Sequence, residues 1–173
     1  MALRKIVLKG DEILTKTCKE VKEITPRIIE LLEDMVDTMI ENDGVGLAAP
    51  QVGVMKRIFV ARPYPDAENE EDDVVYFMIN PEIVSREGEQ VSLEGCLSMP
   101  GYIGHVDRPM KVTIKAQDVD GEWYEYEFEG FAAVVMCHEY DHLDGIMYCD
   151  IAKEVMTNEE YASRNEESKE NEE

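Results

Sequence analysis

The 173-residue sequence has no apolar run long enough to cross a membrane, and residues 1–5 lead into an apolar stretch too short for a signal peptide. We therefore expect a cytoplasmic protein with no membrane partner. The sequence has only four cysteines and no Cys-x-x-Cys spacing, and cytoplasmic thiols are reduced by default. Cys18, Cys137 and Cys149 are expected to be free thiols.

Basic residues are scarce as well. The sequence has 17 Lys and Arg against 39 Asp and Glu, which gives a net charge of −22. Such a balance argues against electrostatic capture of nucleic acid or of an anionic membrane surface. The segment 157–173 carries seven Glu against Arg164 and Lys169, and we expect it to be solvated.

Only three histidines are present, and two of them, His138 and His142, are four residues apart with Glu139 between them. On a helix the two imidazoles lie about 40° apart around the axis, and Glu139 can face the same cleft. Neutral imidazoles suit a divalent transition metal, and the adjacent carboxylate can take a proton from a water that the metal activates. The alternative is that both histidines are hydrogen-bonded core residues.

Two imidazoles do not hold a catalytic metal well, so a third ligand is needed. A downstream glutamate (Glu154, Glu159 or Glu160) could serve geometrically. Cys96 is the better candidate, because it lies in the stretch 93–101 (LEGCLSMPG), where flanking Gly and Pro place it at a strand end or turn.

Three motifs resemble those of the peptide deformylases, in that family's order: 44–53 (GVGLAAPQVG), 94–98 (EGCLS) and 138–145 (HEYDHLDG). Each motif alone is modest evidence, but the ordered set is specific, and the similarity runs from about residue 6 to about residue 151. Many members have Gln before the first motif histidine. Cys137, which stands there, is also seen in the family.

The resemblance implies a metal-dependent hydrolase that removes the formyl group from the N-terminal formylmethionine of newly made polypeptides and releases formate. This is a co-translational step of protein biosynthesis. Cys96, His138 and His142 would hold one divalent ion. The family works with iron(II), and a thiolate with two imidazoles is also compatible with zinc, nickel or cobalt. The partners are nascent formylmethionyl peptides, and any contact with the ribosome would not use a basic tail.

The resemblance also implies roles for residues around the metal. Glu139 acts as the base, while the Gln51 amide and the Leu97 backbone N–H receive the developing oxyanion. The loop around Val45 and Gly46 binds the peptide. A methionine pocket is formed by Phe131, Val134 and Val135, for which simple core packing remains the alternative.

The stretch 44–49 also matches the dinucleotide pattern G-x-G-x-x-A, but its context excludes that reading. It follows a predicted helix instead of a strand, and Pro50 would interrupt the helix that must hold a pyrophosphate. Zinc endopeptidases share the His-Glu-x-x-His helix, and a non-catalytic metal- or peptide-binding module is a further alternative. Cleavage of unformylated peptides would indicate the first, and binding without formate release the second.

Periodicity predicts an α+β fold, with small mixed or antiparallel sheets packed around a central metal-bearing helix. Thr25 and Pro26 begin an amphipathic helix that residues 42–44 end, and residues 1–24 form an extended arm. Strands are expected at 57–61, 74–79 and 83–84, with a turn at Asn80-Pro81, and at 111–116 and 122–128 as a hairpin. An acidic loop, 63–73, separates the first two strands.

The metal-bearing helix is predicted over 131–143, with Gly145 just beyond its end. Its first half is apolar all round, which predicts burial at the centre of the domain. We expect a single catalytic domain over residues 1–151, followed by an acidic C-terminal tail, 152–173, that is either partly helical or disordered.

Overall fold

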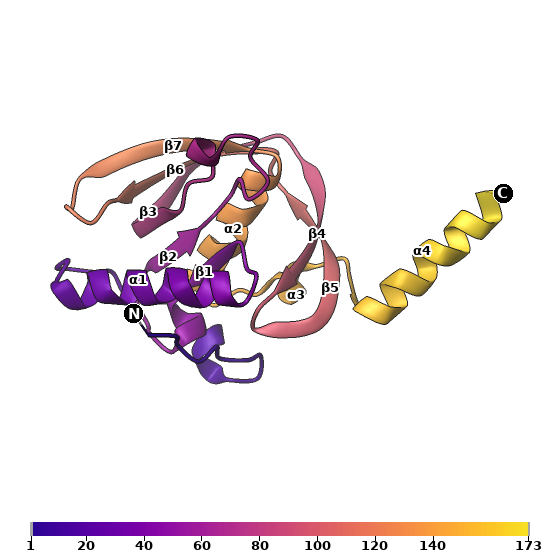
Figure 1. Ribbon diagram of the computed structural model, residues 1–173, viewed down its shortest axis with the longest axis horizontal. Helices are drawn as coiled ribbons and strands as arrows, with labels where there is room; N and C mark the ends of the chain where they lie inside the picture. Colours follow the sequence, from indigo (N-terminus) through magenta and orange to yellow (C-terminus); the bar gives the residue numbers. More distant parts are fainter. Residues whose placement is uncertain (1, 173) are drawn as a thin grey trace.

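A five-stranded sheet forms the larger layer of the fold (Figure 1). The computed structural model describes residues 2–172, so the first residue of the predicted arm and the last of the predicted tail lie outside the described residues. All neighbouring strands in the sheet are antiparallel. In spatial order they are β1 (Gly46–Ala48), β2 (Ile58–Ala61), β3 (Tyr76–Glu87), β6 (Lys111–Gln117) and β7 (Trp123–Glu129).

Helices α1 (Pro26–Glu41) and α2 (Phe131–Leu143) pack on opposite faces of this sheet. The alternation of side chains along β2 shows why, since Ile58 packs with the α1 side and Phe59 with the α2 side. Both are fully buried. The α+β fold predicted from the sequence is confirmed, with α2 at its centre.

A second, three-stranded antiparallel sheet covers the face of α2 that carries the histidines. Its spatial order is β4 (Gln90–Cys96), β5 (Met99–Arg108) and β8 (Glu154–Thr157). The short helix α3 (Tyr148–Ile151) connects α2 to β8. Because β8 pairs with β5, the folded body includes the first part of the predicted tail.

Helix α4 (Asn158–Glu172) follows β8 and extends away from the body (Figure 1). It has no buried residue. Three 3-10 turns complete the described chain: η1 (Glu12–Thr15), η2 (Ala49–Val52) and η3 (Glu70–Asp72). Residues 2–24 wrap the body as predicted, and the backbone N–H groups of Val7 and Lys9 donate to the carbonyls of Gln51 and Ser98.

The predicted turn at Asn80-Pro81 is wrong, because β3 runs through both residues as one long strand. The register between β3 and β6 shifts there, as at a β-bulge, and Asn80 has a φ of 50°. The Asn80 side chain bonds both backbone groups of Val21 and the side chain of Gln117. These tertiary bonds stabilise residues with turn preferences inside a strand.

Candidate metal centre and cleft

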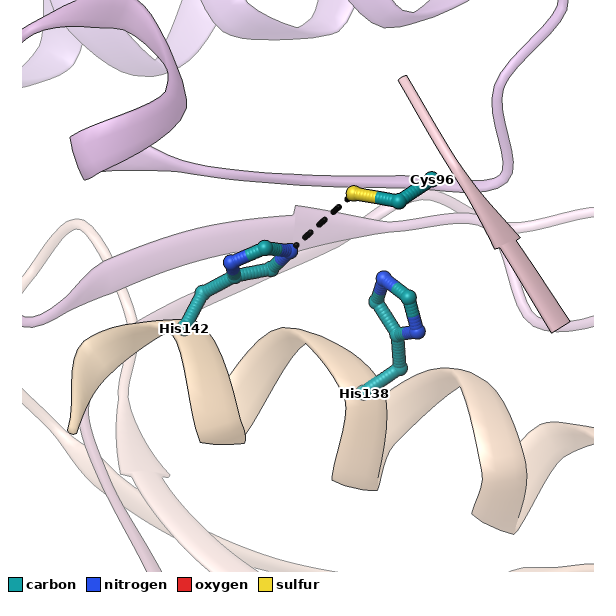
Figure 2. A group of neighbouring side chains, drawn as sticks. All are labelled: Cys96, His138 and His142. Atoms are coloured by element: carbon teal, nitrogen blue, oxygen red, sulfur yellow. Dashed lines mark hydrogen bonds between the residues drawn. The ribbon is translucent and has the colours of Figure 1, made fainter. Parts of the chain in front are cut away.

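Helix α2 presents His138 and His142 toward Cys96 at the end of β4 (Figure 2). The candidate ligand atoms of these three side chains all lie within 4.8 Å of one another, and Cys96 Sγ is 3.4 Å from His142 Nε2. Three such donors fit around one divalent ion. Burial and the neighbouring His138 lower the pKa of His142 well below its usual value, so its imidazole is neutral and able to ligate.

The downstream glutamates lie elsewhere. The carboxylate of Glu154 pairs with Arg164, and that of Glu160 accepts from the Thr157 backbone N–H at the start of α4. Within residues 2–172, one group of at least three His, Cys, Asp or Glu side chains could hold a metal ion. It consists of Cys96, His138 and His142. The structure therefore brings together the predicted donor set that uses the thiolate.

A buried carboxylate orients His138. Its Nδ1–H donates to Glu94 Oε1 over 2.8 Å, which leaves Nε2 for a metal. The ring also stacks on Tyr148, with the ring centroids 6.0 Å apart. Position and tautomer of this imidazole are thus both fixed by the protein.

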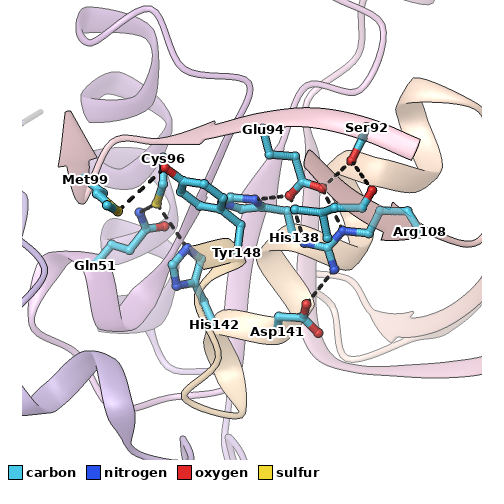
Figure 3. Close-up of polar contacts among 11 residues, drawn as sticks. Gln51, Ser92, Glu94, Cys96, Met99, Arg108, His138, Asp141, His142 and Tyr148 are labelled. Carbon is cyan, nitrogen blue, oxygen red and sulfur yellow. Dashed lines mark hydrogen bonds and ion pairs between the residues drawn. The ribbon is translucent and has the colours of Figure 1, made fainter. Parts of the chain in front are cut away.

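Arg108, which lies in none of the three sequence motifs, holds Glu94 in place (Figure 3). Its guanidinium donates to both Glu94 oxygens over 2.8 Å and to Asp141 Oδ2 over 2.6 Å. Burial by itself raises the pKa of Glu94, but the bonds from Arg108 and His138 outweigh it and lower the pKa to about 2. The only available sequence signal was general: an acidic residue inside a buried motif requires a cationic partner.

Glu139 lies beside the three donors and is only 5% exposed. Its Oε2 atom has no hydrogen-bond partner within residues 2–172. Burial raises the pKa of this carboxyl to about 7. A buried carboxyl with a free oxygen and a pKa near neutrality can accept a proton and return it.

Gln51 reaches the same centre from η2 and is 1% exposed. Its Oε1 accepts from the Ala48 backbone N–H, and its Nε2 donates to Ser98 Oγ over 3.1 Å. The same Nε2 also donates to Cys96 Sγ over 3.4 Å, and Figure 3 shows these two side chains side by side. The side chain therefore supports its own turn and also directs an amide N–H at Cys96 of the donor set. Leu97 follows Cys96 directly in the β4–β5 connection.

A cavity of about 550 Å³ opens over these residues. It is lined by Gln51, Leu97, Cys96, His138 and Glu139 and by all five residues predicted to bind the peptide: Val45, Gly46, Phe131, Val134 and Val135. The second sheet supplies a wall that the sequence did not predict, including Met99, Tyr102 and Ile103.

Within residues 2–172, no helix is both long and apolar enough to span a bilayer.

The chain is similar to known proteins over most of its length. The family model described as "Polypeptide deformylase" matches residues 3–158. A peptide deformylase of Lachnoclostridium phytofermentans is 51% identical over 150 residues, which is 87% of this chain and 89% of the relative. One from Acetivibrio thermocellus is 46% identical over 171 residues, covering 99% and 96% of the two chains.

Solved structures agree. The peptide deformylase of Thermotoga maritima superposes with a TM-score of 0.81 at 37% identity and covers 89% of this chain and 100% of its own. A class I type b peptide deformylase of Acinetobacter baumannii, with Met-Ala-Ser bound, has a TM-score of 0.80 at 34% identity, covering 87% and 98% of the two chains.

Proposed function

The chain belongs to the peptide deformylase family, and we propose that its cleft carries out that family's reaction with the residues described above. The enzyme hydrolyses the formyl amide of an N-terminal formylmethionine on a newly made polypeptide and releases formate. One observation carries the assignment of roles: the Cys96, His138 and His142 donors converge beside a buried carboxyl, Glu139, that has a free oxygen.

We propose that Cys96, His138 and His142 hold the divalent ion, which supplies an activated water and polarises the formyl carbonyl. Iron(II) is the ion proposed for the native enzyme, and zinc, nickel and cobalt can substitute because thiolate and imidazole ligands suit all four. A thiolate beside iron(II) makes the site sensitive to oxidation, so the protein is purified anaerobically for the tests below.

Glu139 takes a proton from the attacking water and delivers it to the leaving amine. Its position beside the donors supports this role, as does a pKa that burial raises to about 7. The Gln51 amide and the Leu97 backbone N–H donate to the oxygen on which negative charge develops. Gln51 is preorganised for this because Ala48 fixes its Oε1 atom.

The methionine side chain enters the apolar part of the cavity, formed by Phe131, Val134 and Val135, and the loop of Val45 and Gly46 binds the peptide backbone. The Acinetobacter baumannii structure supports a methionyl peptide as the ligand, because Met-Ala-Ser begins with the free methionine that deformylation produces. We propose that the enzyme acts in the cytoplasm on nascent chains. The acidity of α4 disfavours this helix as a contact to ribosomal RNA.

The proposed catalytic domain, residues 1–151, supplies the three donors and Glu139. The proposed tail, 152–173, contributes β8 to the second sheet and Asn158 to the cavity wall.

The test is formate release from formyl-Met-Ala-Ser by anaerobically purified protein, with bound metal quantified on the same sample. The rate should scale with bound metal. Glu139→Gln should retain the metal and lose turnover, whereas Glu166→Gln on the exposed face of α4 should change neither. Absence of formate from fully metallated protein would overturn the proposed function, and unformylated peptides would then be tested for internal cleavage.

A further inference from the structure

Residues 2–9, the arm segment, cross both parts of the proposed oxyanion site. The backbone N–H of Val7 donates to the carbonyl of Gln51 over 2.7 Å, and that of Lys9 donates to the carbonyl of Ser98 over 2.7 Å. Ser98 directly follows Leu97, whose backbone N–H is the second proposed oxyanion donor. One short segment therefore bonds to the backbone beside each of the two oxyanion donors.

The two oxyanion donors come from different sheets. Gln51 lies in η2, which directly follows β1 of the five-stranded sheet, whereas Leu97 lies between β4 and β5 of the three-stranded sheet. Neither sheet alone fixes the distance between them. Val7 and Lys9 are two residues apart, and a chain extends at most about 3.6 Å per residue, so their N–H groups are no more than about 7 Å apart. The arm segment thus limits how far the two oxyanion donors can separate.

The side chains of Gln51 and Ser98 form a second link between the same two parts of the chain. Gln51 Nε2 donates to Ser98 Oγ over 3.1 Å, and the two residues are 1% and 0% exposed. A hydrogen bond buried in this way is stronger than one exposed to water. Each residue is therefore held at its carbonyl by the arm segment and at its side chain by the other residue.

The beginning of the arm segment is fixed to α1 (Figure 1). Arg4 donates from its backbone N–H to Thr38 Oγ1 over 2.9 Å, and its Nε and Nη2 atoms donate to Asp34 Oδ2 over 3.0 Å and 2.9 Å. The Ala2 backbone N–H donates to Asp34 Oδ1 over 3.0 Å. Asp34 is 3% exposed, and a carboxylate so deeply buried requires such partners. The arm segment is therefore held at both ends.

We infer that the arm segment is a positioning element for the reaction. Through Val7 and Lys9 it holds the Gln51 amide and the Leu97 backbone N–H at the separation that the developing oxyanion requires. This inference rests on the proposed function and extends it to a part of the chain that neither lines the cleft nor belongs to the metal donor set. Oxyanion donors are effective because they are in place before the negative charge develops.

Proline variants test the two bonds, because proline lacks the backbone N–H. Val7→Pro and Lys9→Pro should each lower kcat for formate release from formyl-Met-Ala-Ser by about tenfold, which is less than the loss of a whole oxyanion donor. KM and bound metal should be unchanged, because the affected interaction forms in the transition state. Leu8→Pro is the matched control and should keep kcat, since the Leu8 N–H forms no hydrogen bond within residues 2–172.

A second route leaves the backbone of the arm segment intact. Arg4→Met removes the cation that fixes the segment to Asp34 and should lower kcat several-fold, again with KM and bound metal unchanged. Arg4→Lys restores a cation and should recover most of the rate. The control is Arg62→Met, which breaks an ion pair with Asp73 outside the arm segment and should leave kcat unchanged.

A peptide with a thioformyl group distinguishes positioning from general damage to the fold. Sulfur accepts hydrogen bonds more weakly than oxygen, so the oxyanion donors contribute less to hydrolysis of this peptide. Val7→Pro should therefore lower kcat by a smaller factor for thioformyl-Met-Ala-Ser than for formyl-Met-Ala-Ser. Partial unfolding would lower both rates by the same factor.

Equal rates in Val7→Pro and Leu8→Pro, or equal losses for the two peptides, would overturn the inference while leaving deformylation intact. A loss of rate that comes with a loss of bound metal, or through KM alone, would overturn it as well. Absence of formate from the unaltered, fully metallated chain would overturn the proposed function and this inference with it.

Discussion

A Cβ atom added to Gly46 would lie 2.5 Å from Oε1 of Glu139. The backbone of the first motif therefore occupies the space directly against the buried carboxyl, and a side chain at this position would displace it.

Gly46→Ala should lower kcat for formate release by about a hundredfold, the order expected when a reacting group moves by about 1 Å. Metal content should stay unchanged, because neither residue belongs to the donor set. Gly95→Ala is the comparison, since its added Cβ would make only an ordinary contact of 3.5 Å. Similar rates in the two variants would show that Gly46 does not position Glu139.

Arg108→Met should lower the free energy of unfolding by about 3–5 kcal/mol, because it leaves Glu94 and Asp141 without their shared cation in the interior. Urea unfolding measures this loss. The control is Lys153→Met, which breaks an exposed pair with Asp107 and should cost less than about 1 kcal/mol. Comparable losses would mean that the Arg108 cluster contributes no more than a surface pair.

The free energy of unfolding should decrease as the pH falls, because Glu94 becomes protonated. Its folded pKa of about 2 lies below the ordinary value of 4.5, so its contribution is fully present above about pH 4.5 and is lost as the pH falls toward 2. The difference corresponds to about 3 kcal/mol. Urea unfolding of metal-free protein between pH 2 and pH 6 should therefore show a smaller slope for Glu94→Gln than for the unaltered chain, and parallel curves would contradict the assignment.

Cys96→Ser should weaken metal binding by at least about 10–100-fold, the loss typical of removing even an outer partner of a metal ligand. Dialysis against a competing chelator, with the metal quantified afterwards, measures the effect. Cys149→Ser replaces a half-buried thiol outside the donor set and should leave retention unchanged. Undiminished metal in Cys96→Ser would move the third ligand to another side chain, with Glu154 the first to test.

A chain ending at Asn158 should keep both its stability, within about 1 kcal/mol, and its rate on formyl-Met-Ala-Ser. Helix α4 buries no residue, and its ion pair with the body, Arg164 to Glu154, is exposed. Urea unfolding and formate release measure the two quantities. A large loss of either would show that α4 supports the second sheet or the cleft.

Local sequence signals predicted the parts of the fold that short-range chemistry determines. Helix α2 has the predicted bounds because Gly130 precedes it and Gly145, with a φ of 74°, follows it. The β6–β7 hairpin follows from alternation on both sides of Asp120-Gly121. Two of the three predicted metal ligands lie close together because they share one face of α2.

Other features depend on contacts that no local pattern encodes. Strands β4 and β5 include Gly95, Gly101 and Gly104, and glycine weakens the sequence pattern of a strand. Antiparallel pairing between the two strands stabilises them. Arg108 lies at the end of β5 and meets Glu94 and Asp141 only through packing of the second sheet on α2.

The donor set joins the end of β4 to α2, and Cys96 and His142 are 46 residues apart in the chain. A bound ion therefore acts as a cross-link that closes this loop, in the way that a disulfide would. On a chain-entropy estimate, closing 46 residues disfavours the unfolded chain by about 4 kcal/mol. Loss of the ion through oxidation of the thiolate would then open the cross-link, so that inactivation and susceptibility to unfolding proceed together.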